Sequence, residues 1–189
     1  MDYFFYCRDR EGAGDLRSQL VEEHWAFMDR FAEAMIARGP TLTGDLDGAT
    51  GSVHIVELPD AEAARVFAFE EPNQLAGVYR QITVRRYVDL LGRTMGDFPG
   101  ERGEGPGRYL VLAHGKPLMD WPGAEQTEPV LDRDRLIAWG RLLSEDGEDW
   151  EGTAVIGEFS DPETIRDLFA ATGAYDRIEV HPWTFGGRR

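Results

Sequence analysis

The chain has almost no cysteine and no long apolar run. Cys7 is its only cysteine, which excludes a disulfide within the chain and a cluster of thiolate metal ligands. We therefore expect a reducing, cytoplasmic environment. No apolar stretch approaches the roughly 18 residues that span a bilayer. The apolar segment DYFFYC at residues 2–7 lacks the basic leader of a signal peptide, so we expect a buried first strand there and no membrane partner.

Positive charge is scarce as well. The chain carries 35 acidic side chains against 20 Lys and Arg, which gives a formal net charge of −15. Such a charge repels phosphate backbones and anionic lipids, whereas nucleic-acid-binding proteins normally show the opposite balance. The acidic residues are scattered rather than blocked, which favours a role in solubility. The composition therefore predicts no nucleic-acid partner.

Sequence motifs that bind cofactors or metals are absent. The glycine-rich residues 92–107 lack the lysine and the strand–helix context of a phosphate-binding loop. There is no His-x-x-x-His or His-x-x-Glu-His pairing, so a metal site would have to combine distant residues. A Gly-x-Ser-x-Gly nucleophile turn and flavin, nicotinamide and haem signatures are missing too. We expect any catalysis to proceed without a cofactor or a metal.

What the chain does contain is an internal repeat. GSVHIVELPDAEAARVFAF at residues 51–69 aligns without gaps to GTAVIGEFSDPETIRDLFA at residues 152–170, with six identities in nineteen positions. The identical pairs are Gly51 and Gly152, Ile55 and Ile156, Glu57 and Glu158, Asp60 and Asp161, Glu62 and Glu163, and Arg65 and Arg166. Further on, Gly77 and Tyr79 correspond to Gly173 and Tyr175 after a deletion of five residues. The repeat predicts a tandem duplication.

A long helix is predicted early in the first copy. Its apolar residues at 16, 20, 27, 31 and 35 share one stripe of a helix spanning residues 15–37. His24 falls on the same stripe. Gly39 and Pro40 are expected to end the helix.

The remaining elements complete a βαββαβ order. We expect a short strand around residues 41–42, a strand at residues 52–58, a helix from the Asp60 cap to about residue 70, ended by Pro72, and a strand at residues 81–88. An antiparallel four-stranded sheet with helices on one face leaves its other face open, and two such sheets can cover each other. The predicted fold is α+β, with two repeats at residues 1–91 and 108–189 packed as an intrachain pseudo-dimer. Residues 92–107, with six Gly and two Pro, form the predicted linker.

The first copy resembles the YCII-related family. The resemblance covers residues 2 to about 90 and rests on CRDREG after the first strand, the helix with His24, the Gly39–Pro40 pair, GSVHIVE, and EEPNQLAGVYRQITV. The second copy is similar mainly through the internal repeat. The resemblance implies ferredoxin-like units that pair into a dimeric α/β barrel, here within one chain.

The resemblance also implies an active-site pair. In that family a histidine on the first helix and an acidic residue after the second helix are the proposed pair, and these positions correspond to His24 and Glu71. The chain reads Glu-Pro-Asn where the family has Asp-Pro-Tyr, and VEEHW where a basic residue often precedes the histidine. Some members resemble a dehydrochlorinase acting on hydroxylated aromatic rings.

The candidate site residues each have two interpretations. A histidine, with an ordinary pKa near 6.5, suits proton transfer, but His24 could equally fill an inner helix position. Ser52 could bind a substrate oxygen or simply follow a turn. His54 shares the face of Ser52 and could line the same cavity or be structural. Asp9 is interpreted, with Arg10, as part of a turn with a solvated charge.

The second copy lacks these candidates. The segment that corresponds to the helix of His24 reads AEQTEPVLDRDRLIAW, residues 124–139, without a histidine, and Glu71 falls at the deletion. His114 and His181 match nothing in the first copy. We expect the second copy to be a structural partner that closes the cavity of the first.

Three functions follow from these observations. The first is a cofactor-independent lyase, isomerase or dehydrochlorinase-like enzyme acting on a small organic substrate, with His24 as acid/base, Glu71 as its orienting carboxylate, and Ser52 and His54 as substrate contacts. The second is a module that binds a small molecule without turnover. The third is a structural interaction protein, and assembly into a homo-oligomer remains open in each case. A cavity reached by His24 and Glu71 favours the first two.

Overall fold

The chain folds around one antiparallel sheet of eight strands, in the order β2-β3-β1-β4-β6-β7-β5-β8. The structure is a computed structural model and describes residues 1–102, 107–116 and 128–187. Its class is mixed α+β. Among the described residues, no helix has the length and apolar character needed to cross a bilayer.

The elements of the first half run from β1 to β4. They are β1 Asp2–Asp9, α1 Gly14–Gln19, α2 Val21–Asp29, the 3-10 helix η1 Ala32–Ala34, β2 Met35–Leu42, β3 Ala49–Glu57, α3 Ala61–Phe69, α4 Pro72–Leu75 and β4 Tyr79–Asp89. A further 3-10 helix, η2, spans Met95–Asp97. The elements of the second half are β5 Arg108–Gly115, the 3-10 helix η4 Arg133–Arg135, β6 Leu136–Leu143, β7 Trp150–Glu158, α5 Pro162–Ala170 and β8 Tyr175–Pro182.

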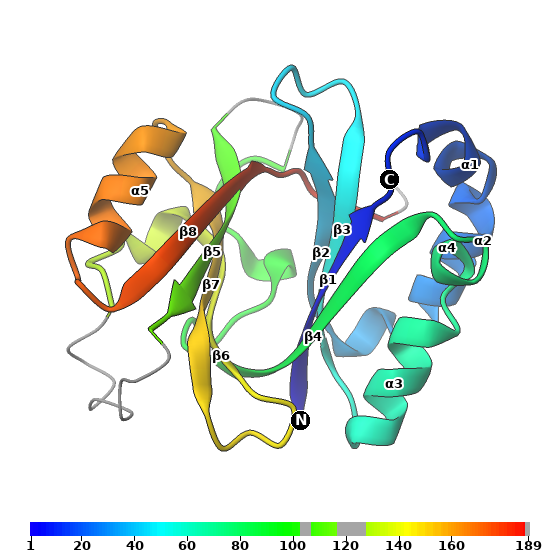
Figure 1. Ribbon diagram of the computed structural model, residues 1–189, viewed down its shortest axis with the longest axis horizontal. Helices are drawn as coiled ribbons and strands as arrows, with labels where there is room; N and C mark the ends of the chain where they lie inside the picture. The colour runs from blue at the N-terminus through cyan, green and yellow to red at the C-terminus, as the bar shows by residue number, and fades with distance from the viewer. Residues whose placement is uncertain (103–106, 117–127, 188–189) are drawn as a thin grey trace.

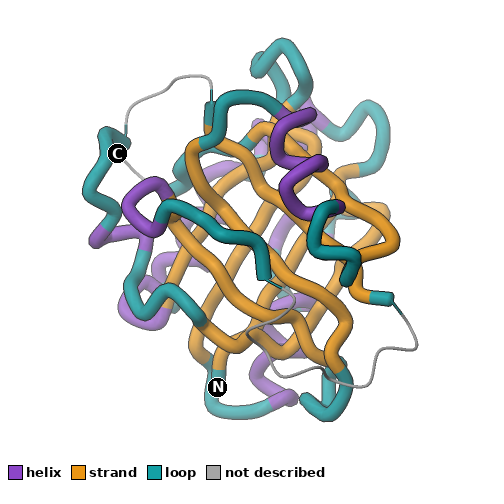
Figure 2. Tube along the Cα trace, turned by 90° about the vertical axis from the view of Figure 1, so that its left-hand side faces the viewer, coloured by secondary structure: helices purple, strands orange, loops and turns teal. Residues whose placement is uncertain are grey.

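Strand order is the same in the two halves. The first half is arranged β2-β3-β1-β4 and the second β6-β7-β5-β8, and β4 joins them by pairing with β6. Figure 1 shows the two sets of four strands facing each other, with α1 to α4 outside one set and α5 outside the other. Figure 2 shows the strands crossing the molecule between these helices. The largest core cluster therefore lies between the two sets of strands and includes Phe4, Tyr6, Leu110, Leu112 and Trp183.

The helices of the two repeated segments begin where the sequence predicts. Asp60 caps α3 by accepting a hydrogen bond from the Ala63 backbone N–H, and Asp161 caps α5 through Thr164 in the same way. Pro72 was expected to end the second helix, but it occupies the first turn of α4 instead. A proline fits there because its missing N–H has no partner within the helix in any case.

The predicted helix over residues 15–37 is wrong in its last third. Apart from the short η1, helical structure ends at Asp29, and Met35–Leu42 forms strand β2. Burial alternates at every residue of β2, which is the two-residue period of a strand with one face buried. Gly39 and Pro40 therefore lie inside a strand rather than at a helix end.

The segment predicted as a linker is packed where the structure describes it. Residues 103–106 lie outside the described residues. Phe98 is 5% exposed and belongs to the core cluster between the two sets of strands, and Met95 packs against that cluster. The connection thus contributes to the core that unites the halves.

The chain after β8 returns to the first half. Residues 183–187, which we call the C-terminal tail, run beside β2, with Thr184 N–H donating to the Pro40 carbonyl at 3.3 Å and Gly186 N–H to the Arg38 carbonyl at 3.0 Å. A Cβ atom at Gly39 would collide with the Thr184 carbonyl and the Trp183 ring, so only glycine permits this close approach.

Candidate active site

A histidine–carboxylate contact joins α2 to the start of α4. His24 Nδ1 lies 2.6 Å from Glu71 Oε1. The second oxygen of Glu71, Oε2, accepts a hydrogen bond from the Gln74 backbone N–H at 3.1 Å, so Glu71 is the N-cap of α4. Glu71 is 2% exposed. A buried carboxylate needs partners of this kind, and here both of its oxygens have one.

Strand β3 places two of the predicted residues beside this pair. Its first buried residues include Ser52 and His54, both on the face that α2 covers. The His54 ring centroid lies 5.8 Å from that of His24, and Nδ1 of His54 is buried without a hydrogen-bond partner. Burial lowers the pKa of His54 well below its ordinary value, and the nearby His24, Arg17 and Arg38 lower it further. His54 is therefore a neutral imidazole at pH 7.

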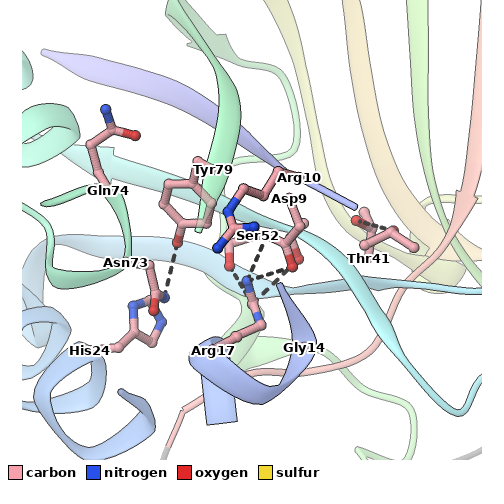
Figure 3. Close-up of polar contacts among 12 residues, drawn as sticks. Asp9, Arg10, Gly14, Arg17, His24, Thr41, Ser52, Asn73, Gln74 and Tyr79 are labelled. Atoms are coloured by element: carbon pink, nitrogen blue, oxygen red, sulfur yellow. Dashed lines mark hydrogen bonds and ion pairs between the residues drawn. The ribbon is translucent and has the colours of Figure 1, made fainter. Parts of the chain in front are cut away.

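Arg17 on α1 was not identified from the sequence. Its Nη1 donates to both Asp9 oxygens at 3.0 and 3.2 Å, and its Nη2 donates to Ser52 Oγ at 2.6 Å, as Figure 3 shows. The sequence spacing indicates its position, because Arg17 stands seven residues before His24. Seven residues are two helical turns, which places both side chains on the same face.

Asp9 corrects a second expectation. Its side chain was interpreted as solvated, yet it is 7% exposed and paired with Arg17. Burial raises the pKa of Asp9, and the Arg17 charge and hydrogen bonds oppose that rise. The last residue of β1 thus contributes a buried acid that holds Arg17 against Ser52.

The groups behind the pair are also buried. The thiol of Cys7 is fully enclosed, and burial raises its pKa well above the usual value, so it is not a thiolate nucleophile at neutral pH. Asn73 Nδ2 donates to the Tyr79 hydroxyl at 3.2 Å (Figure 3). Burial raises the pKa of Tyr79 well above its usual value as well. These groups form a neutral polar layer rather than a source of charge.

A cavity of about 310 Å³ opens beside these residues. It lies between α1 and α2 on one side and β2, β3 and the C-terminal tail on the other. Its polar lining comes from Arg17, His24, Arg38, Ser52, His54 and Asn73. Glu71 is not part of the lining and reaches the cavity through His24. The volume is at the lower end of the range of ligand-binding pockets in proteins, about 300–1,000 Å³.

The histidines of the second half lie elsewhere. His114 and His181 both contact Glu179, through Nε2 at 2.8 and 3.2 Å, and Arg8 of β1 pairs with the same carboxylate at 2.7 Å. Hydrogen bonds from His114, His181 and Arg8 hold the pKa of Glu179 far below its usual value. Within the described ranges, no three His, Cys, Asp or Glu side chains are grouped as ligands for a metal ion.

Comparison with known proteins gives one family match and several solved structures. Residues 1–88 match the YCII-related domain. A 5-chloro-2-hydroxyhydroquinone dehydrochlorinase from Burkholderia phenoliruptrix, solved with 2,5-dihydroxybenzoquinone, is 26% identical over 47% of this chain and 95% of its own, with a TM-score of 0.45. A chlorite dismutase variant from Candidatus Nitrospira defluvii is 13% identical over 98% of this chain and 91% of its own, with a TM-score of 0.55.

The second likeness extends over both halves and concerns the fold alone. No curated protein matches the chain.

Proposed function

We propose that the YCII-related domain formed by residues 1–88 is the catalytic part of an enzyme that moves a proton on a small organic substrate without a cofactor. The reaction type is that of a lyase or isomerase, including a dehydrochlorinase-like elimination. The observation that carries this proposal is the hydrogen-bonded His24–Glu71 pair at the wall of a ligand-sized cavity.

The geometry supports an acid/base role for His24. With Glu71 as the acceptor, the Nδ1–H of His24 is fixed and its Nε2 is the atom left to accept a proton. The buried carboxylate then stabilises the imidazolium that forms. Glu71 acts as a positioning residue, because it is held by the α4 backbone and does not line the cavity. A positioned acid/base contributes about 10²- to 10⁴-fold to a rate.

Ser52 and His54 are proposed as substrate contacts. Both line the cavity next to His24. Ser52 Oγ accepts a hydrogen bond from Arg17 and also interacts with the Tyr79 hydroxyl, so a substrate oxygen would compete with Tyr79 for the Ser52 hydroxyl. His54, being neutral, can donate or accept one hydrogen bond without competing for the transferred proton.

For the second half we propose the role of a structural partner. We propose two ferredoxin-like repeats, at residues 1–91 and 108–189, in an intrachain pseudo-dimeric α/β barrel. Two matching contacts support it: Tyr87 pairs with Leu142 on one side, and Trp183 bridges to Thr41 on the other. The barrel closes by the second contact, which also brings the C-terminal tail over the cavity.

A non-catalytic binding module is the second candidate. The observation in its favour is that Asp9 and Ser52 engage the Arg17 guanidinium and that His54 is neutral, so neither group is placed to take part in proton transfer. Such a lining suits ligand binding without turnover. The cavity itself argues against a purely structural protein.

The test is proton exchange. Hydroxylated aromatic compounds and enolisable acids are incubated with the protein in D₂O, and loss of the carbon-bound proton is followed by NMR. We expect exchange with at least one compound, and its reduction by about 10²-fold or more in His24→Asn. His114→Asn, which changes a histidine outside the cavity, is the control. Exchange that is absent throughout, or equal in His24→Asn, contradicts the enzyme proposal.

A further inference from the structure

The cavity contains a second arginine, and its guanidinium has an ion-pair partner but a buried nitrogen without a hydrogen bond. Arg38 lies on β2 and lines the cavity, and its side chain is 14% exposed. Its Nη1 is buried and has no hydrogen-bond partner. Asp29 Oδ1 is 3.7 Å from Nη1, which is too long for a hydrogen bond. Since the Asp29 side chain is 41% exposed, water also screens this ion pair.

The two arginines of the cavity therefore differ. Arg17 makes three hydrogen bonds to Asp9 and Ser52. No hydrogen bond holds the Arg38 guanidinium within the part of the chain that the structure describes. Leaving a buried charged donor without an acceptor is unfavourable, and an acceptor that enters the cavity would remove this penalty. Arg38 is thus the donor that a ligand can use.

The backbone of Arg38 is held from two sides. Its carbonyl accepts from the Gly186 N–H at 3.0 Å, and its own N–H donates to the Met95 sulfur at 3.2 Å. A Cβ atom at Gly187 would collide with the guanidinium, so the tail packs closely against this side chain. Residues from the connection and from the second half therefore set the position of Arg38 in the cavity.

We infer that Arg38 binds the carboxylate of the substrate, and that the cavity takes a small organic acid. A guanidinium presents two parallel N–H donors that match a carboxylate. A chain with a net charge of −15 repels anions at long range, so a local cation is needed to retain one. The volume of about 310 Å³ suits a single ring or a short chain. This inference deepens the proposed function and rests on it for the role of His24.

Binding of matched acids and amides tests the inference directly. Benzoate, phenylacetate and acetate are compared with benzamide, phenylacetamide and acetamide by ligand-observed NMR titration. We expect at least one acid to bind about 10-fold or more tightly than its amide, because a charge-assisted pair replaces a neutral contact. In Arg38→Gln that acid should lose about 10-fold or more in affinity, and the preference over the amide should disappear. The control is Arg65→Gln on the exposed surface of α3, which should change neither value.

Other results overturn the inference. They are equal binding of acid and amide in every pair, no binding by any acid, or unchanged acid binding in Arg38→Gln. If Arg38→Gln does not fold by circular dichroism, Arg38→Lys replaces it: this variant keeps the charge without the paired donors and should lose part of the affinity. Unchanged affinity in a folded Arg38→Lys then decides against the inference.

The same titration separates this inference from the proposed function. Binding requires no proton transfer, so His24→Asn should keep the preference for the acid. A protein that binds acids through Arg38 but exchanges no proton contradicts the enzyme proposal alone. A protein that exchanges protons through His24 but shows no preference for acids contradicts the Arg38 inference alone.

Discussion

Strands β2 and β3 of the first half and strands β6 and β7 of the second half differ at the positions that line the cavity in the first half. By the register of the strands, His54 on β3 corresponds to Val155 on β7, and Arg38 on β2 corresponds to Trp139 on β6. Val155 and Trp139 belong to one apolar cluster. The second half therefore has apolar side chains at the positions where the first half has an imidazole and a guanidinium.

Helices α3 and α5, which cover these strands, also differ in the size of their buried side chains. Ala64 and Ala68 of α3 correspond in the repeat to Ile165 and Phe169 of α5, and all four are buried. Small residues on α3 leave room for α2 and the cavity, whereas the large residues on α5 fill the space themselves. The hydroxyl pair survives, since the Tyr175 hydroxyl donates to Thr153 Oγ1 at 3.0 Å where the first half has Tyr79 and Ser52. One scaffold thus supports either a cavity or a filled core, and a few side chains decide which.

The largest expected effect on stability comes from removing a large buried side chain from the second half. Phe169→Ala removes a fully buried ring, so the free energy of unfolding should fall by about 3–5 kcal/mol. Phe69→Ala on α3, where the ring is 49% exposed, should cost less than about 1 kcal/mol. Urea denaturation of both variants measures the difference. Equal losses would contradict the view that α5 fills a core.

The two contacts between the halves can be separated by matched glycine variants. A Cβ at Gly39 would collide with Trp183 and the Thr184 carbonyl, and a Cβ at Gly140 would collide with the Tyr87 ring. Gly39→Ala and Gly140→Ala should each lower the free energy of unfolding by about 1–3 kcal/mol, because the packing on either side must shift. Gly39→Ala alone should also weaken ligand binding, since the tail that it displaces lines the cavity. Thermal denaturation and NMR titration measure the two effects, and equal loss of binding in both variants would remove the distinction.

Removing the carboxylate that the second half lacks should reduce activity. Glu71→Gln keeps an oxygen acceptor near Nδ1 but loses the charge, so the rate of proton exchange should fall about 10- to 100-fold, as for other residues that orient an imidazole. Glu71→Asp should retain more activity than Glu71→Gln. The ¹⁵N chemical shifts of His24 should show a changed tautomer in Glu71→Gln. An unchanged tautomer and rate would mean that Glu71 serves only as the cap of α4.

The smallest effect concerns pH. Because the pKa of His54 is lowered by folding, the unfolded chain takes up a proton below pH 6.5 that the folded chain does not. Stability should therefore decline as the pH falls below about 6.5, by at most about 1.4 kcal/mol per pH unit from this residue. His54→Val, which copies Val155, should remove that part of the slope. Urea denaturation at pH 7 and pH 5 gives the change in the free energy of unfolding for the original protein and for His54→Val. The contributions of the other titrating groups cancel when the two changes are subtracted.

The sequence predicts the parts of this molecule that depend on neighbouring residues. The repeated strand–helix units appear with their Asp60 and Asp161 caps, since a cap and its helix are contiguous. Phe31 and Met35 suit a helix as well as a strand, so periodicity alone did not show where α2 ends. Gly39 was interpreted as a helix stop, whereas its reason is a close approach by residues 183–187 from the other end of the chain.

The candidate site also contains residues that the sequence predicts and residues that it does not. His24, Ser52 and His54 line one cavity, and Glu71, which the family resemblance indicates, lies behind His24 rather than in the lining. Arg17 could have been found two turns before His24. Arg38 could not, because its place in the cavity depends on the C-terminal tail and on Met95, neither of which is near it in sequence.

The joining of both halves in one chain has a genetic consequence. In a symmetric pair of identical subunits, every substitution appears twice, so a change that fills one cavity fills the other. Here the contact of Gly39 with Trp183 and that of Gly140 with Tyr87 are encoded separately and involve different aromatic rings. Each half can therefore accumulate mutations under its own selection. Substitutions that change the packing of one half therefore leave the side chains around the cavity of the other half unchanged.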